Sequence, residues 1–177
     1  MPEALQPQEL LEALARHRVD YVLIGGLAAT LHGSSALTND ADICPDQSSE
    51  NLERLAAALR DMKARIRTEG EAEGVAFSAD PDFLRRSQIV NLATRFGDFD
   101  IAFQPAGSRG FEDLVRDAVD MEVDGIIVRV ASLADIIRSK EAANRPKDRA
   151  TLPILYALQD EIAKSNEIAK GDEIANR

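Results

Sequence analysis

The sequence predicts a single α/β (α+β) domain with a small mixed, mostly antiparallel sheet that is flanked by helices. Short β-like runs alternate with amphipathic helical segments along the chain. Two pairs of these runs are joined by turn sequences typical of β-hairpins. The length of 177 residues and the hydrophobic content of 45% suffice for one buried core.

The first half of the chain is expected to alternate helices and buried strands. Leucines at helical spacing mark the first and third helices, and a short apolar run ended by glycines marks the first strand. Ser48 or Ser49 is a suitable N-cap for the third helix. The polar stretch 66–86 contains several breakers and gives no clear pattern. The predicted elements are helix 7–17, strand 21–24, helix 27–32, strand 41–44 and helix 50–62.

The second half is expected to contain two hairpins and a helical end. The turns are Arg95-Phe96-Gly97 and Asp124-Gly125, and Ser132 is a plausible N-cap for the helix that follows the second hairpin. We expect a core over 1–131, a helical part of the same domain over 132–164 and a frayed helical tail over 165–177. The predicted elements are strands 88–94 and 98–103, helix 111–118, strands 119–123 and 126–131, helix 132–143 and helix 147–164.

Composition excludes several classes of protein. A net charge of −10 argues against coating nucleic acid or an anionic membrane by charge alone. One cysteine and two histidines exclude a disulfide framework and make a Cys/His metal site improbable. The apolar runs are too short to cross a membrane, and the N-terminus has no secretion-signal pattern, so we expect a cytoplasmic protein without a membrane partner.

The strongest chemical signal is a glycine pair followed by two spaced carboxylates. Gly25-Gly26 ends a buried strand and opens a helix, where free backbone N–H groups suit a triphosphate. Asp40 and Asp42 follow in an extended segment, so both side chains point to the same face. Two adjacent carboxylates repel each other unless a cation lies between them, and Mg²⁺ prefers such oxygen ligands. The alternative is a polar turn that leads into a strand.

A third candidate metal ligand, Asp100, lies in the first predicted hairpin. Asp100 stands between apolar neighbours in a β-like run, an uncomfortable place for an unpaired charge. Asp98, two residues earlier, points to the same face of the strand but lies nearer the turn. Asp100 is therefore the better candidate for a metal ligand. Exposure on an edge strand is the alternative interpretation of Asp100.

Together these motifs resemble the nucleotidyltransferase superfamily of the polymerase-β type. The run VLIGGLAATLHGSSALTNDADI is similar to its AbiEii/MenT-type branch, the nucleotidyltransferase toxins of type IV toxin–antitoxin systems, and to their uncharacterised relatives. The later Phe-Asp-Ile at Asp100, the Lys-x-x-Ala motif at Lys140 and a further aspartate at Asp148 follow in the same order as in that branch. The resemblance covers roughly residues 18–155.

The resemblance implies transfer of a nucleoside monophosphate from an NTP, ATP among them, to an acceptor hydroxyl. Asp40, Asp42 and Asp100 would bind Mg²⁺ or Mn²⁺, with two ions about 3.5–4 Å apart stabilising the attacking and leaving oxygens. A hydroxyl contact to phosphate would come from Ser34, Ser35 or Thr38. The catalytic residues implied are Asp40, Asp42, Asp100 and Lys140. The nucleotide-binding residues implied are Gly25, Gly26, Ser34, Thr38, Lys140 and Asp148.

The acceptor stays open at the level of sequence. The branch implies a toxin that modifies the acceptor end of tRNA, together with a cognate antitoxin. A protein hydroxyl (AMPylation) or a small molecule such as an aminoglycoside is the alternative acceptor, and the acidic composition mildly favours these two. A non-catalytic binding module on the same fold is the third interpretation. Segment 138–149 carries a local charge of +3, which suits either a polyanionic partner or a solvated surface.

Overall fold

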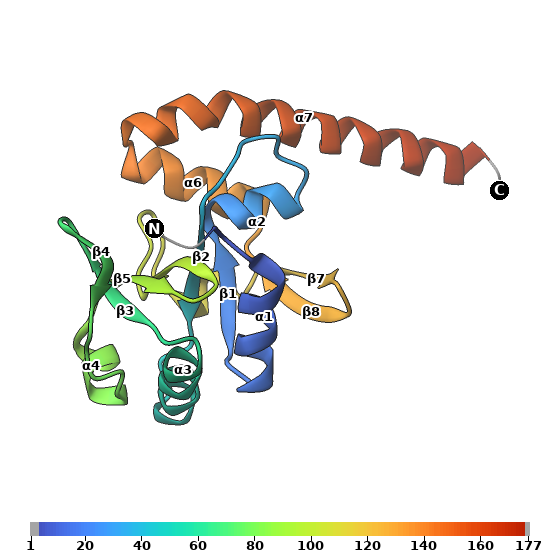
Figure 1. The fold of residues 1–177 in the computed structure, drawn as a ribbon. Coiled ribbons are helices and arrows are strands. Elements are labelled where there is room, and N and C mark those ends of the chain that lie inside the picture. Colours follow the sequence, from blue (N-terminus) through green and yellow to red (C-terminus); the bar gives the residue numbers. More distant parts are fainter. Residues whose placement is uncertain (1–3, 176–177) are drawn as a thin grey trace.

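In the computed structural model, which describes residues 4–175, one mixed sheet of eight strands runs through the molecule (Figure 1). The strand order is β4-β3-β5-β6-β2-β1-β8-β7. β1 pairs in parallel with β8 and β2 with β6, whereas the other neighbours are antiparallel. The strands are β1 (Tyr21–Ile24), β2 (Asp40–Pro45), β3 (Arg65–Thr68), β4 (Glu71–Val75), β5 (Ile89–Thr94), β6 (Gly97–Ala102), β7 (Val119–Val123) and β8 (Ile126–Val130).

Helices cover the sheet from two sides. In Figure 1, α1 and α3 lie beside the strands in the lower part of the picture. The helices α2, α6 and α7 lie above the strands. The helices are α1 (Pro7–Arg16), α2 (Gly25–Leu31), α3 (Ser49–Asp61), α4 (Pro81–Arg86), α5 (Phe111–Leu114), α6 (Leu133–Ala143) and α7 (Pro146–Ala175). This arrangement confirms the predicted mixed, mostly antiparallel sheet flanked by helices.

Two rows of side chains that cross the central strands give the sheet an apolar face and a polar face. Strand register aligns Leu23, Ile43, Ile101 and Val90 across β1, β2, β6 and β5, and all four side chains are buried. They belong to the same apolar core as the buried leucines of α1 and α3. The next residue in each strand points to the opposite face of the sheet. The row of side chains on that face contains Asp42 and Asp100.

The structure differs from the sequence-based expectation most in residues 66–86. This stretch forms the β3–β4 hairpin and the short helix α4, whose N-cap Asp80 accepts a hydrogen bond from the Phe83 N–H. Most residues of the hairpin are exposed or half-buried because it lies at the edge of the sheet. A strand that buries neither face shows no hydrophobic alternation, which is why the sequence pattern did not reveal it.

Smaller differences concern helix ends. α2 begins at Gly25 rather than 27, because the first turn of a helix needs no intrahelical N–H bond and so tolerates glycine there. α5 ends at Leu114, earlier than predicted. The predicted N-caps of α3 and α6 are confirmed, with Ser48 accepting from the Asn51 N–H and Ser132 from the Asp135 N–H.

α6 and α7 form a helical hairpin whose turn lies beside the acids. Asn144 takes a left-handed conformation between the helices, and α7 begins at Pro146. The first part of α7 packs on the core through Leu155, but every residue from 159 to 170 is exposed. Among the described residues, no helix has the length and apolar character needed to cross a membrane.

Candidate active site

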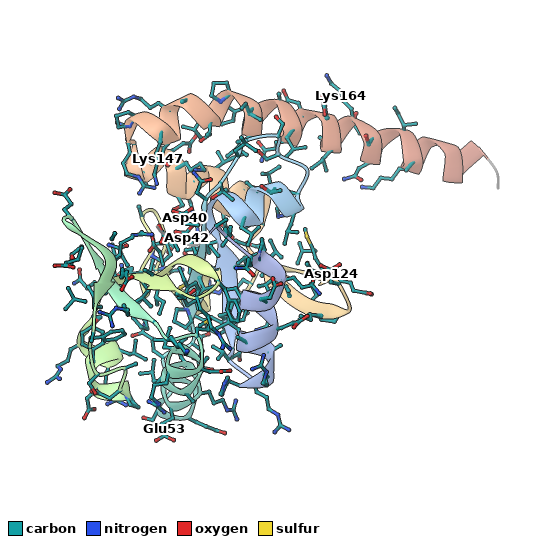
Figure 2. All side chains as sticks on the ribbon, in the orientation of Figure 1. Asp40, Asp42, Glu53, Asp124, Lys147 and Lys164 are labelled. Atoms are coloured by element: carbon teal, nitrogen blue, oxygen red, sulfur yellow. The ribbon has the colours of Figure 1, made fainter. Side chains whose placement is uncertain are left out.

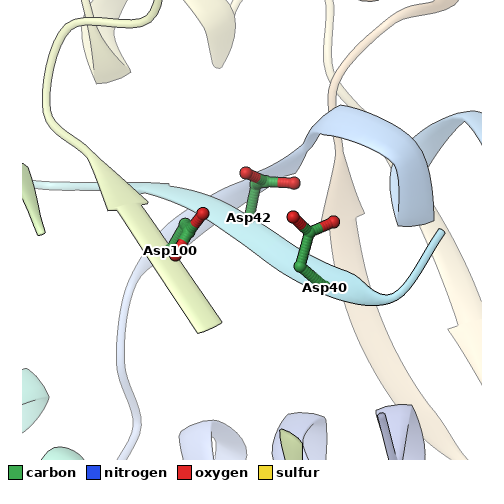
Figure 3. Close-up of side chains that lie close together, drawn as sticks. All are labelled: Asp40, Asp42 and Asp100. Atoms are coloured by element: carbon green, nitrogen blue, oxygen red, sulfur yellow. The ribbon is translucent and has the colours of Figure 1, made fainter. Parts of the chain in front are cut away.

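Three aspartates from two neighbouring strands converge on the polar face of the sheet. Parallel pairing of β2 with β6 places Asp42 directly opposite Asp100, and Asp40 lies two residues away on the same face. One carboxylate oxygen from each of the three lies within 4.8 Å of the others. Figure 3 shows all three side chains on one side of the two strands. Such a set of hard oxygen donors suits Mg²⁺ or Mn²⁺.

Two of the three acids have raised pKa values. Burial, together with the neighbouring charges of Asp40 and Asp100, raises the pKa of Asp42 to about 7. Burial also raises the pKa of Asp100, although the charge of Arg67 opposes this effect. A cation bound between these neighbouring carboxylates would stabilise their ionised forms. The site therefore fits a divalent metal.

Arg67 is a functional candidate that the sequence analysis missed. From β3 its guanidinium reaches across β5 to both oxygens of Asp100, at 2.8 and 2.9 Å, and to Asp98 at 2.5 Å. Asp98 shares this arginine with Asp100 but lies outside the three-acid cluster. Arg67 lies in the stretch without periodicity, so no local signal marked it.

The two glycines lie where a side chain would collide with the site. Gly25 has φ +69°, and a Cβ there would lie 2.3 Å from Oδ2 of Asp42. A Cβ on Gly26 would lie 2.6 Å from the Thr38 hydroxyl. Glycine therefore lets the backbone approach Asp42 closely at position 25 and Thr38 closely at position 26. This arrangement brings the predicted glycine pair and the predicted Asp-x-Asp motif together.

Lys140 and Arg145 both pair with the buried carboxylate of Asp148, and Lys140 and Asp148 were both predicted from sequence. Asp148 is fully buried, and its carboxylate binds Lys140 Nζ at 3.3 Å and Arg145 Nε at 2.7 Å. It also accepts from the Arg145 backbone N–H, which anchors the start of α7. Although burial opposes ionisation, the Arg145 hydrogen bond and charge hold the pKa of Asp148 below its usual value. The carboxylate thus holds two cations beside the acids.

The predicted hydroxyl residues lie in the loop between α2 and β2. Thr38 donates its hydroxyl to Oδ1 of Asp40 at 2.8 Å and so fixes that carboxylate. Ser34 is buried, and its hydroxyl accepts from the Ala36 N–H. Both residues line the same cavity as the glycine pair.

Two cavities meet at the acids. The first, of about 300 Å³, is lined by the glycines, the 34–40 loop and three cations, Lys140, Arg145 and Lys147. We call it the cationic cavity. Figure 2 shows Lys147 above Asp40 and Asp42, at the start of α7. The second, of about 280 Å³, is lined largely by apolar side chains, and we call it the apolar cavity. Five residues line both cavities: Gly25, Asp42, Asp100, Lys140 and Arg145.

Comparisons with solved structures identify nucleotidyltransferases as the fold relatives. The lincomycin-bound lincosamide antibiotic adenylyltransferase LnuA has a TM-score of 0.59 at 14% identity, over 88% of this chain and 99% of its own. ANT(2″)-Ia in complex with adenylyl-2″-tobramycin has a TM-score of 0.53 at 15% identity, over 94% of this chain and 95% of its own. No protein-family model and no curated protein matches the sequence. The chain therefore has the nucleotidyltransferase fold.

Proposed function

We propose that this protein is a nucleotidyltransferase that depends on Mg²⁺ or Mn²⁺ and moves a nucleoside monophosphate from an NTP to an acceptor hydroxyl. The observation that carries the proposal is the convergence of three aspartates at the border of a cationic cavity and an apolar cavity. The shared fold with two adenylyltransferases supports the same chemistry.

Each group of residues has a role in this proposal. Asp40, Asp42 and Asp100 hold the divalent metal, which when bound neutralises charge at the reacting phosphate. Lys140 and Arg145 bind the triphosphate as fixed cations, and Asp148 positions both of them. The acceptor oxygen bonds to the α-phosphorus as the bond to the bridging oxygen breaks. Pyrophosphate leaves with that electron pair, and the hydroxyl proton passes to solvent.

The sequence resemblance and the fold relatives favour different acceptors. The AbiEii/MenT-type branch favours the acceptor end of tRNA, with a role as a toxin that a cognate antitoxin restrains. The names of LnuA and of the ANT(2″)-Ia complex refer to small antibiotics, which favours a small-molecule hydroxyl. The acidic composition also disfavours a long polyanionic acceptor. A protein hydroxyl is the remaining alternative for the enzyme.

The first experiment measures transfer of label from each α-³²P-labelled NTP in the presence of Mg²⁺. Total tRNA, lysate protein, lincomycin and tobramycin are supplied as separate acceptors. Labelled product that depends on Mg²⁺ supports the proposal, and its identity gives the acceptor class. The variant Asp42→Asn is expected to lose transfer, whereas Asp124→Asn, in the distant β7–β8 turn, is expected to retain it.

A binding measurement separates an inactive relic from an enzyme whose acceptor was not supplied. Calorimetry with Mg²⁺ and α,β-methylene ATP reports the nucleotide site without requiring an acceptor. If the analogue does not bind the wild-type protein and no transfer occurs, the nucleotidyltransferase proposal is wrong. The non-catalytic module would then be the better interpretation.

A further inference from the structure

Four aspartates form two facing pairs on the polar face of the sheet. The parallel register of β2 and β6 sets Asp40 opposite Asp98, and Asp42 opposite Asp100. Within each strand the two acids are two residues apart, so their side chains point to the same face. All four are half-buried, and solvent therefore screens their mutual repulsion only in part. Together they carry more negative charge than one divalent ion balances.

Arg67 supplies positive charge to the β6 pair. One terminal nitrogen of its guanidinium contacts Asp98 Oδ2 at 2.5 Å, and the other contacts both oxygens of Asp100, at 2.8 and 2.9 Å. β5 lies between the arginine and this pair, and its residues paired with the two acids, Asn91 and Ala93, carry no charge. The fold thus has one built-in cation that is shared by the two acids of β6.

The β2 pair has no such partner. Within residues 4–175, no lysine, arginine or histidine nitrogen lies within 4.0 Å of a carboxylate oxygen of Asp40 or Asp42. Lys140 and Arg145 line the cationic cavity with these acids, but both cations pair with Asp148. The negative charge of the β2 pair is therefore left for a metal ion to balance.

We infer that Arg67 takes the place of a second metal ion, so that the site holds a single divalent cation. That ion binds the three-acid cluster. A second ion would need the oxygens of Asp98 and Asp100 that the guanidinium already bonds, and the charge of the guanidinium repels it. This inference rests on the proposed function, because it sets the number of ions in the same metal site. The two ions that the sequence resemblance implies then become one ion and one arginine.

The test counts the Mn²⁺ ions that bind to the full-length protein in the absence of nucleotide. Electron paramagnetic resonance measures free Mn²⁺ during a titration, which gives the number of ions bound per chain. We expect one tight ion for the wild-type protein and its loss in Asp42→Asn. Arg67→Met is expected to bind a second ion at least about 10-fold more tightly than the wild-type protein does. Arg67→Lys, which keeps the charge, is expected to bind only one tight ion.

Two further variants show whether the second ion is specific to the β6 pair. Arg129→Met removes an arginine of similar exposure, 37% against 32% for Arg67, that also bridges two aspartates, at 2.8 and 3.9 Å. It is expected to gain no tight ion, because those aspartates belong to no cluster of three acids within the described chain. Asp98→Asn combined with Arg67→Met is expected to return to one ion. Thermal melts confirm that each variant is folded.

Four outcomes overturn the inference. Two tight ions in the wild-type protein show that Arg67 leaves room for both. A single ion in Arg67→Met shows that the arginine only anchors the β3–β4 hairpin. A second ion that persists in the double variant, or that also binds to Arg129→Met, lies elsewhere on the acidic surface. Failure of the proposed function is distinct, because the ATP analogue then fails to bind the wild-type protein whatever the ion count.

Discussion

At Asp42 the folded protein disfavours the ionised carboxylate that the proposed metal site requires. Burial and two neighbouring carboxylates raise its pKa to about 7, so the metal-free protein holds a proton there that the unfolded chain releases near pH 3.8. Between these pH values the folded state binds more protons than the unfolded state. The free energy of unfolding therefore falls as the pH rises from about 4 to about 7.

Replacing Asp42 by asparagine is expected to stabilise the metal-free protein in a pH-dependent way. At pH 8 the gain is on the order of 2 kcal/mol, because the variant avoids a buried charge beside two others. Near pH 4 the gain in stability should vanish, because residue 42 is then uncharged in both the folded wild-type protein and the folded variant. Urea unfolding in EDTA at several pH values measures this, with Asp124→Asn as the control. A gain independent of pH would contradict the electrostatic explanation.

Arg67 has the role of an internal cation beside the third acid. It satisfies both oxygens of Asp100 and bridges to Asp98, which lies on the same face of β6. Its own side chain is 32% exposed, so solvent screens part of the attraction. The guanidinium is therefore a moderate contributor to stability and a strong contributor to the position of Asp100.

The variant Arg67→Met is expected to lose about 1 kcal/mol of stability in EDTA, because two carboxylates then lack their shared partner. Mg²⁺ should restore most of this loss by supplying positive charge at Asp100. Paired thermal melts with EDTA and with Mg²⁺ measure the difference. Arg67→Lys, which keeps the charge but not the paired hydrogen bonds, should show a smaller loss. An identical loss in both buffers would argue against charge compensation.

At the scale of elements, the junction between β1 and α2 sets how close the backbone comes to the acids. β1 ends at Ile24, and α2 begins directly at Gly25, whose positive φ turns the chain. The neighbouring β1–β2 pairing puts Ile24 opposite Asp42, so this turn lies directly against the carboxylate. A side chain at the turn would occupy the space that the carboxylate needs.

The substitution Gly25→Ala is expected to destabilise the protein by several kcal/mol and to abolish metal binding. It combines a strained φ with a Cβ placed 2.3 Å from Asp42 Oδ2. Gly70→Ala is the matched control, because Gly70 also has a positive φ but has no atom within 4 Å of the added Cβ. It should cost only the backbone strain, about 1 kcal/mol. Equal losses in the two variants would show that contact with Asp42 is unimportant.

At the scale of the whole molecule, the site depends on the first part of α7 and not on its far end. Asp148 and Lys147 lie in the first turn of the helix, and Leu155 anchors it in the core. Beyond Leu158 the described side chains up to residue 170 are all exposed, and in Figure 1 the helix projects past the rest of the fold.

Removing residues 165–177 is therefore expected to leave stability and nucleotide binding unchanged. Residues 165–170 of the deleted segment are exposed, and the deletion keeps every residue that lines the two cavities. Denaturant unfolding and calorimetry with Mg²⁺ and α,β-methylene ATP measure the two properties. A clear loss of either would mean that the distal part of α7 folds back onto the domain or stabilises an assembly.

Local patterns in the sequence determined much of this protein. The two-residue period of a strand places Asp40 and Asp42 on one face, and glycine at 25 and 26 marks the tight turn, because both depend only on neighbouring residues. Most helices and strands, the two predicted hairpins and the mixed sheet follow from similar local signals. The roles assigned to the site residues stay predictions.

Only the tertiary structure decided which distant residues meet. Asp100 joins the pair because parallel β2–β6 pairing sets it opposite Asp42, and strand register is not encoded in either strand alone. Arg67 reaches Asp100 across an intervening strand, from an exposed hairpin without hydrophobic alternation. Asp135 resembles an ordinary first-turn helix acid in sequence, and only packing buries its second carboxylate oxygen. These contacts arise from long-range packing, which leaves no periodic trace in the chain.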